Sequence, residues 1–170
     1  MQSKKKGTLF WIEGYSGSGK TSVANLMHDE ITKKFGKTII INGDDLRNIF
    51  DLHNYSEKGR FETFKKYAKL AKFITNQNIN LIFTVVGLKK YQRIWLKNNI
   101  QNFIGILIKT NISDIIKFNK KKKIYKNKKN IVGVDIEADI PRNTEVVVNN
   151  DFKISLKKIK NKIIKKISLL

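Results

Sequence analysis

Short apolar runs alternate along the chain with segments in which apolar residues recur every three or four positions. The apolar runs, bounded by glycine or polar residues, predict five buried strands, at residues 8–13, 38–42, 81–86, 103–109 and 145–148. The segments between them predict amphipathic helices. One helix begins after a glycine-rich segment and ends near Gly36, and three others cover residues 44–51, 60–76 and 91–99. Uniformly apolar strands separated by amphipathic helices are typical of a parallel sheet with helices on both faces. We therefore predict an α/β fold with strand 8–13 at the centre of the sheet.

Two segments depart from this alternation. Residues 119–142 are polar and rich in lysine, and a loop of this length in a compact domain is usually functional or disordered. We interpret it as a basic lid. Residues 152–168 place apolar side chains at helical spacing with lysines between them, which predicts a basic amphipathic helix that covers the sheet. Binding of this helix to a membrane surface is the weaker alternative. The 170 residues suit a single domain.

The net charge of +21 raises the question of a nucleic-acid partner. Only four of the 35 basic residues are arginine, whereas nucleic-acid sites rely on arginine for bidentate contacts. We therefore interpret most of the charge as solvated surface that favours an anionic substrate, and we do not expect nucleic acid as the main partner.

Cysteine is absent from the sequence, which excludes a disulfide framework and a thiolate zinc site. The basic N-terminal segment precedes an apolar run that is too short for a secretory signal. No run approaches the roughly 20 apolar residues of a membrane span. We expect a cytoplasmic protein without a transmembrane segment, and the sequence leaves a homodimer open.

Residues 14–21, GYSGSGKT, match the phosphate-loop pattern GxxxxGK[ST] at each fixed position. They follow a predicted buried strand and precede a predicted helix, so that backbone N–H groups and the helix N-terminus can face the same phosphate. In this pattern the lysine, here Lys20, reaches the β- and γ-phosphates and the Thr21 hydroxyl ligates Mg²⁺. We therefore expect ATP and Mg²⁺ as cofactors, and a nucleotide site formed by Gly14, Tyr15, Ser16, Gly17, Ser18, Gly19, Lys20, Thr21 and Ser22.

Downstream segments narrow the class of phosphate-loop protein. We find no NKxD-type segment for the base recognition of a GTPase, and the third predicted strand, LIFTVVG, does not end in the acid of a motor or transporter ATPase. The second predicted strand is followed instead by NGDDLR at residues 42–47 and YSEKGRFE at residues 55–62.

With these segments, the chain resembles the adenylylsulfate kinases, which phosphorylate the 3′-hydroxyl of adenosine 5′-phosphosulfate. GYSGSGKTS corresponds to their phosphate loop, NGDDLR to their acid–arginine segment and YSEKGRFE to their substrate-binding turn. Residues 122–126 fall where the family has its lid lysines, and residues 133–145 resemble its GID and acidic-proline segment. The resemblance covers roughly residues 9–150 and implies a P-loop kinase.

Charged side chains in the matching segments suit phosphoryl transfer. Asp44 follows the carboxyl end of a predicted strand, where its carboxylate can orient or deprotonate an attacking hydroxyl or help to hold hydrated Mg²⁺. The alternative is that Asp44 caps the adjacent helix. Arg47 and Arg60 suit the 5′-anion of an acceptor nucleotide, with surface charge as their alternative. We take Lys20 and Asp44 as catalytic residues, and Lys122, with Lys126, as the lid contacts to phosphate.

The differences from the family fall on the acceptor side. The two phenylalanines that sandwich the acceptor adenine align with Tyr55 and Ile131, and the arginine–aspartate pair before the lid lysine is replaced by Asn119 and Lys120. Losing one aromatic face weakens base stacking by about 1–3 kcal/mol, which a pyrimidine tolerates better than adenine. The resemblance therefore implies a cytidine diphosphoramidate kinase branch, which transfers the γ-phosphate to the 3′-hydroxyl of cytidine 5′-diphosphoramidate in capsule phosphoramidate synthesis. Adenylylsulfate as the acceptor, and a nucleic-acid-binding NTPase, are the alternatives.

Overall fold

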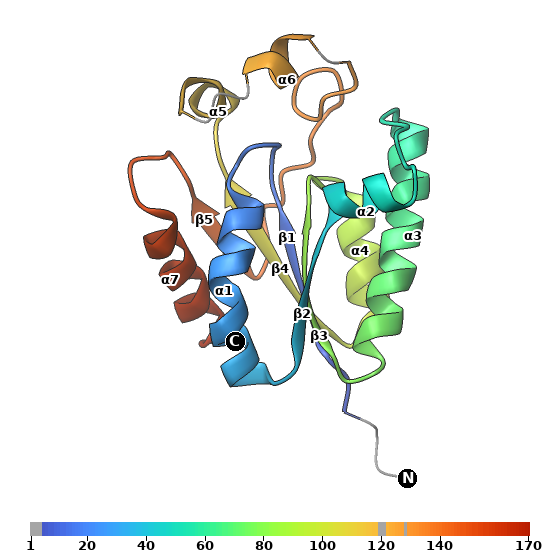
Figure 1. Ribbon diagram of the computed structural model, residues 1–170, viewed down its shortest axis with the longest axis vertical. Coiled ribbons are helices and arrows are strands. Elements are labelled where there is room, and N and C mark those ends of the chain that lie inside the picture. The colour runs from blue at the N-terminus through green and yellow to red at the C-terminus, as the bar shows by residue number, and fades with distance from the viewer. Residues whose placement is uncertain (1–4, 119–121, 128) are drawn as a thin grey trace.

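The computed structural model describes residues 5–118, 122–127 and 129–170, which form a parallel sheet flanked by helices (Figure 1). The order of the strands across the sheet is β2-β3-β1-β4-β5, and all neighbours are parallel. This arrangement confirms the predicted five-stranded sheet with the first strand at its centre. The strands are β1 (Thr8–Glu13), β2 (Thr38–Asn42), β3 (Asn80–Val85), β4 (Asn102–Lys109) and β5 (Val146–Asn149).

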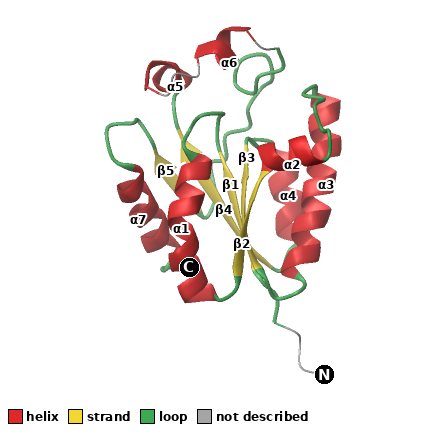
Figure 2. Cartoon of the chain, in the orientation of Figure 1, coloured by secondary structure: helices red, strands yellow, loops and turns green. Residues whose placement is uncertain are grey.

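Helices cover both faces of the sheet (Figure 2). Successive side chains of a strand point to opposite faces, so Phe10 and Ile12 of β1 pack in one hydrophobic cluster and Leu9 and Trp11 in another. The first cluster is completed by α1 (Lys20–Phe35) and α7 (Leu156–Ile167), and the second by α3 (Glu57–Thr75) and α4 (Lys90–Asn99). Strands buried on both faces explain why their sequences are apolar throughout rather than alternating.

Hydroxyl caps set the start of two helices at positions that the apolar spacing did not predict. The Ser56 hydroxyl accepts a hydrogen bond from the Gly59 N–H at 3.1 Å, so α3 begins before residue 60. The Ser155 hydroxyl accepts one from the Lys158 N–H at 3.3 Å, so α7 begins at Leu156. Phe152, which the spacing placed on this helix, lies in the loop before it.

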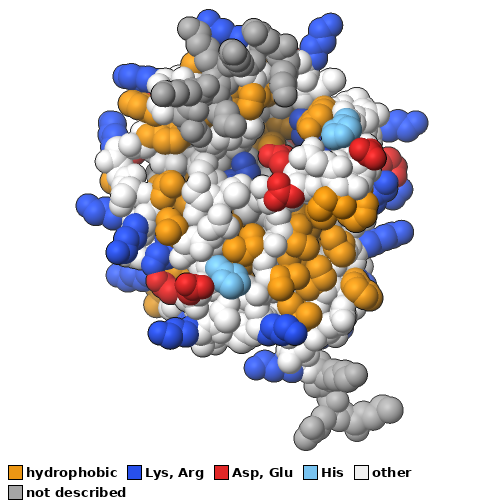
Figure 3. All heavy atoms as spheres, viewed as in Figure 1, with side chains coloured by type: hydrophobic (Ala, Val, Ile, Leu, Met, Phe, Trp, Pro, Cys, Tyr) orange, Lys and Arg blue, Asp and Glu red, His pale blue; other side chains and the backbone are white. Residues whose placement is uncertain are grey.

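Helix α7 buries Ile159, Ile163 and Ile167 against the sheet. Of its lysines, Lys160 forms an ion pair with Glu30 of α1, and the Lys166 ammonium donates to the Val147 carbonyl at 2.8 Å. Figure 3 shows lysine and arginine side chains spread over the visible face of the molecule rather than gathered in one patch. Within the described residues, no helix is both long and apolar enough to cross a membrane.

Two short helices, α5 (Ile112–Phe118) and α6 (Lys122–Asn127), lie beyond the carboxyl edge of the sheet (Figure 1). We did not predict them because both are short: α5 has only seven residues, although Ile112, Ile115 and Ile116 follow helical spacing, and lysines interrupt the apolar period of α6. After α6, the N–H groups of Asp135 and Ile136 both donate to the Ile131 carbonyl, at 3.0 and 3.1 Å. The segment that we interpreted as a lid therefore contains a helix and a tight turn.

Candidate functional site

The phosphate loop, residues 14–21, joins the end of β1 to the start of α1. Its glycines Gly14, Gly17 and Gly19 all have positive φ angles, of 155°, 82° and 94°. A side chain at Gly14 would place its Cβ atom 2.6 Å from the Ile108 carbonyl oxygen. The loop therefore needs glycine both for its backbone angles and for its close approach to β4.

The loop forms one wall of a cavity, which we call the phosphate cavity. Its other walls come from the ends of β2 and β3. Lys20 is almost buried as a residue, and its ammonium donates to the Tyr15 carbonyl at 2.7 Å, which places it against the loop. The cavity is lined by Ser16, Gly17, Gly19, Lys20, Thr21, Ser22, Asn42, Asp44, Thr84, Val85 and Val86.

Three residues of the expected nucleotide site lie outside this lining. Gly14 and Ser18 are buried beneath the loop. Tyr15 packs instead against the segment that follows α6, where a Cβ atom on Gly133 would lie 2.4 Å from its ring. These residues shape the loop rather than face the cavity.

Asp44 lies in the first turn of α2 (Gly43–Ile49), and Asn42 caps this helix. The Asn42 Oδ1 atom accepts hydrogen bonds from the Asp44 N–H at 3.4 Å and from the Thr84 hydroxyl at 3.0 Å. The capping role that we considered for Asp44 therefore belongs to Asn42. The exposed Asp44 side chain lines the phosphate cavity and a second cavity beside it.

We call this second cavity the acceptor cavity. It shares Ser16, Asp44, Val85 and Val86 with the phosphate cavity, so the two cavities adjoin at these residues. Its remaining lining comes from β1, α2, α3, α4, the loops before α3 and α4, and the segment after α5. These residues are Trp11, Gly43, Arg47, Tyr55, Arg60, Thr63, Phe64, Tyr67, Gly87, Lys89, Gln92, Ile124, Lys129, Ile131 and Val132. The structure thus brings Arg47, Tyr55, Arg60 and Ile131 together with Asp44.

Two guanidinium groups cluster around Tyr55 at this cavity. The guanidinium carbons of Arg47 and Arg60 lie 4.5 and 5.5 Å from the centre of the Tyr55 ring. Arg60 also donates to the Tyr55 carbonyl at 3.0 Å and to the Asn130 carbonyl at 2.8 Å, and Arg47 donates to the Leu52 carbonyl. Burial, and then the charge of Arg47, lower the pKa of Arg60. Two cations held this close favour an anion between them.

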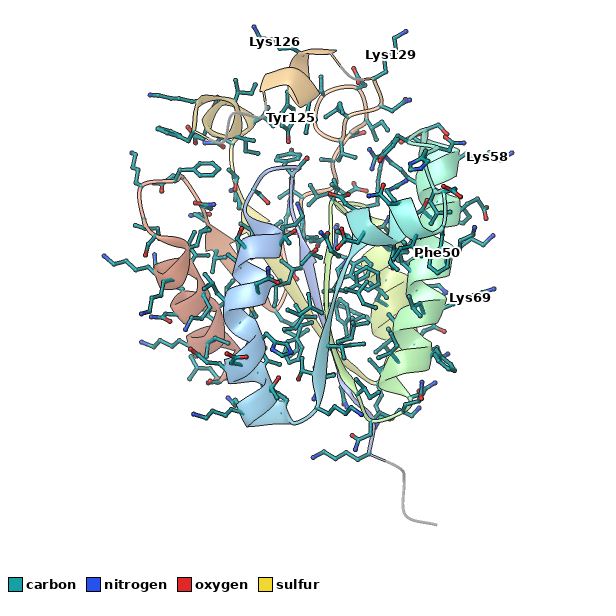
Figure 4. All side chains as sticks on the ribbon, in the orientation of Figure 1. Phe50, Lys58, Lys69, Tyr125, Lys126 and Lys129 are labelled. Atoms are coloured by element: carbon teal, nitrogen blue, oxygen red, sulfur yellow. The ribbon has the colours of Figure 1, made fainter. Side chains whose placement is uncertain are left out.

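The segment after α5 contacts the phosphate loop directly. The Tyr125 hydroxyl donates to the Ser16 carbonyl at 2.6 Å, and burial raises the pKa of this hydroxyl to about 12. In Figure 4, Tyr125 lies beneath α6, whereas Lys126 and Lys129 project outward from this segment. The side chain of Lys122 lies outside the described residues, so its predicted phosphate contact stays a prediction.

A buried ion pair lies next to the turn after β3, whose Gly87 lines the acceptor cavity. Glu13, at the end of β1, is fully buried and lies 3.3 Å from the guanidinium of Arg93. The same carboxylate accepts the Leu88 N–H at 3.0 Å and so fixes the turn after β3, where Gly87 and Leu88 both have a φ angle of 55°. Burial raises the pKa of Glu13 although Arg93 opposes this effect.

Sequence reasoning missed several polar residues of the acceptor cavity. Tyr67 lay on the apolar face of a predicted helix, but its hydroxyl donates to the Gly43 carbonyl at the start of α2, and burial raises its pKa to about 12. The Thr63 hydroxyl donates to the Gly59 carbonyl at 2.9 Å. Gln92 is buried and lies 3.3 Å from the Tyr91 hydroxyl. Gln92 belongs to no motif that the sequence displays.

The protein-family model described as adenylylsulphate kinase matches residues 6–149. The chain belongs to the adenylylsulphate kinase family. Among curated proteins, it is 31% identical to the cytidine diphosphoramidate kinase of Campylobacter jejuni, over 98% of this chain and 99% of that protein. It is 24% identical to a probable adenylyl-sulfate kinase of Bacillus subtilis, over 88% of this chain and 79% of that protein.

Among solved structures, the fold matches that of the APS kinase CysC of Mycobacterium tuberculosis in complex with AMPPNP and APS. The TM-score is 0.84 at 19% sequence identity, and the match covers 96% of this chain and 98% of the other. This likeness confirms the predicted P-loop kinase fold. As a member of this family, the chain is an ATP-dependent kinase.

Proposed function

We propose that the protein transfers the γ-phosphate of ATP to the 3′-hydroxyl of a 5′-substituted cytidine nucleotide, with cytidine 5′-diphosphoramidate as the acceptor in capsule phosphoramidate synthesis. The observation that carries the proposal is that Asp44 lines both of the adjoining cavities. A donor in the phosphate cavity and an acceptor in the other can meet there without leaving the protein. The cytidine diphosphoramidate kinase from Campylobacter jejuni supports this choice of acceptor.

Lys20 and the phosphate loop bind the donor phosphates. Lys20 is already held inside the loop by the Tyr15 carbonyl, so little rearrangement is needed to place its charge against the γ-phosphate. Thr21 and Asp44 offer the phosphate cavity a hydroxyl and a carboxylate, which are the oxygen ligands that Mg²⁺ prefers. Among the described residues, no group of three or more acidic, histidine or cysteine side chains could hold a metal by itself. Mg²⁺ held there would supply charge neutralisation to the transferring phosphate.

Asp44 acts on the acceptor hydroxyl. Its carboxylate borders both cavities, where it can accept a hydrogen bond from the 3′-hydroxyl and point the oxygen at the γ-phosphate. As the new oxygen–phosphorus bond forms and the bond to the β-phosphate oxygen breaks, the hydroxyl proton passes to this carboxylate. Asn42 keeps the start of α2, and with it Asp44, in place.

Arg47 and Arg60 bind the 5′-diphosphoramidate group. Both arginines line the acceptor cavity, and Lys89 adds a further basic side chain to its lining. The nucleotide base lies between Tyr55 and Ile131, one aromatic and one aliphatic wall. Because a pyrimidine has less stacking surface than adenine, it loses less when the second aromatic wall is missing.

Adenylylsulfate is the second candidate acceptor, supported by the match to the adenylylsulphate kinase model. An assay of ADP release against a panel of 5′-substituted nucleotides, with and without RNA, tests the class of acceptor. We expect Mg-ATP turnover to depend on a 5′-diphosphate-like nucleotide and to be unaffected by RNA. Turnover that RNA stimulates in the absence of such a nucleotide would favour a nucleic-acid-dependent NTPase.

We expect Arg60→Met to raise the acceptor KM by at least about tenfold, because a charge-assisted contact to the 5′-anion is lost. The KM for ATP should stay within about twofold of its original value. Lys58→Met is the matched control, since Lys58 lies on the same helix and projects into solvent (Figure 4). Steady-state kinetics with each substrate varied in turn would measure both constants. An unchanged acceptor KM in Arg60→Met would show that Arg60 does not bind the acceptor.

A further inference from the structure

The deepest residues of the acceptor cavity come from β1, α3 and α4. Helices α3 and α4 both run from the carboxyl edge of the sheet toward its amino edge (Figure 1). Along these helices, Phe64 therefore lies about one turn deeper than Arg60, and Gln92 about one turn deeper than Lys89. All four line the cavity, as does Trp11, two residues before the end of β1. We call the part formed by Trp11, Phe64 and Gln92 the deep end.

Two polar groups at the deep end are buried among aromatic rings. Trp11 is 1% exposed, and its Nε1–H donates to no described residue. Gln92 is 6% exposed, and its Nε2 group donates to the Tyr91 hydroxyl at 3.3 Å. The centre of the Phe64 ring lies 6.3 Å from that of Trp11 and 5.6 Å from that of Tyr91. Phe64 therefore joins the strand and the helix that carry the two polar groups.

Both groups are incompletely hydrogen-bonded, and a buried polar group in that state costs free energy that a ligand can recover. The Gln92 nitrogen is directed to Tyr91, so the amide oxygen Oε1 is the acceptor that Gln92 offers to the cavity. The indole Nε1–H of Trp11 is a donor only. The deep end therefore suits a small group that carries both a hydrogen-bond donor and an acceptor.

The positive charge of the acceptor cavity lies at its mouth rather than at its deep end. The guanidinium groups of Arg47 and Arg60 lie beside the ring of Tyr55, which precedes α3. Lys89 precedes α4 and forms an ion pair at 3.0 Å with Glu57, in the first turn of α3. The deep-end side chains are uncharged. A ligand whose charge is held by the two arginines can therefore place a polar group of low charge at the deep end.

We propose that Gln92 and Trp11 recognise a terminal phosphoramidate on the acceptor and so distinguish it from a terminal phosphate or sulfate. This inference rests on the proposed function, in which the base lies beside Ile131 at the mouth and the arginines hold the 5′-group. The P–NH₂ group donates to Gln92 Oε1, and a phosphoryl oxygen accepts the Trp11 Nε1–H. A terminal sulfate has no hydrogen to donate, nor has a phosphate at pH 8, above its second pKa of about 6. Either would set an oxygen against Oε1.

Steady-state kinetics at pH 8, with cytidine 5′-diphosphoramidate and cytidine 5′-diphosphate as alternative acceptors, tests this assignment. We expect the unsubstituted protein to prefer the diphosphoramidate in kcat/KM by at least about tenfold, as one unmatched hydrogen bond allows. Gln92→Met should lower kcat/KM for the diphosphoramidate by about tenfold and change that for the diphosphate by less than about threefold, because only the amine uses Oε1. The KM for ATP should stay within about twofold.

Three further variants separate recognition from packing. Gln92→Glu keeps an acceptor oxygen and adds a negative charge, so it should lower kcat/KM for both acceptors and keep the preference for the diphosphoramidate. Trp11→Phe removes the indole donor, and because both acceptors carry a phosphoryl oxygen, it should weaken both alike. Gln101→Met is the matched control for Gln92→Met, since Gln101 is exposed and precedes β4 at the amino edge of the sheet. It should change neither kcat/KM.

The outcomes distinguish this inference from the proposed function. Use of the diphosphoramidate without preference over the diphosphate would overturn the role of Gln92 and leave the proposed function standing. So would an equal loss for both acceptors in Gln92→Met, which is the result expected if the side chain only packs. A protein that phosphorylates neither cytidine nucleotide would refute the proposed function, and this inference with it.

Discussion

Lys20→Ala is expected to lower kcat by at least about 10³-fold, because charge that follows the transferring phosphate is lost. Lys20 is almost buried and its ammonium is held at the Tyr15 carbonyl of the phosphate loop, and alanine puts no charge in that position. ADP release at saturating acceptor and Mg-ATP would measure the effect.

Lys33→Ala provides the matched control for this variant. Lys33 lies in the last turn of the same helix, α1, at the end remote from the phosphate loop. Its removal takes away one positive charge without touching the cavity, and kcat should remain within about twofold of the original value. A Lys20→Ala protein that melts normally and keeps more than a tenth of its kcat would show that Lys20 is not part of the phosphoryl-transfer site.

Asp44→Asn is expected to lower kcat by at least about 10²-fold while ADP binding largely survives. The amide keeps the size of the side chain but cannot accept the proton of the acceptor hydroxyl. Because Asn42 caps α2, the substitution leaves the helix start intact and should not unfold the protein. Asp45→Asn, at the exposed neighbouring position, is the control and should keep a normal kcat. Single-turnover phosphorylation of the acceptor would measure the chemical step, and near-normal turnover in Asp44→Asn would end its assignment as a catalytic residue.

The sheet and the phosphate loop could be predicted because short stretches of contiguous residues carry the pattern of each. Each strand is a short run buried on both faces, and the loop needs glycines and a lysine at fixed spacing. Helices α5 and α6 escaped prediction because they are short, and in α6 lysines also break the apolar period. The start of α7 was misplaced because a cap at Ser155, rather than the apolar spacing, determines it.

The candidate site was harder to predict because it depends on contacts between distant segments. The bond from Tyr125 to the Ser16 carbonyl joins residues 109 positions apart, and the bond from Asn150 to the Ser18 carbonyl joins residues 132 positions apart. No local pattern encodes either contact. The resemblance to adenylylsulfate kinases directed attention to Arg47, Tyr55, Arg60 and Ile131, which the structure brings to one cavity. It gave no indication of Gln92, which lines the same cavity.

The measurement that tests the central claim most directly compares two acceptors under saturating Mg-ATP, with the phosphorylated hydroxyl identified in each product. The account predicts that cytidine 5′-diphosphoramidate exceeds adenylylsulfate in kcat/KM by at least about tenfold, roughly 1.4 kcal/mol of transition-state discrimination, and that the 3′-hydroxyl carries the new phosphate. Equal or better use of adenylylsulfate, or phosphate on another hydroxyl, would contradict it.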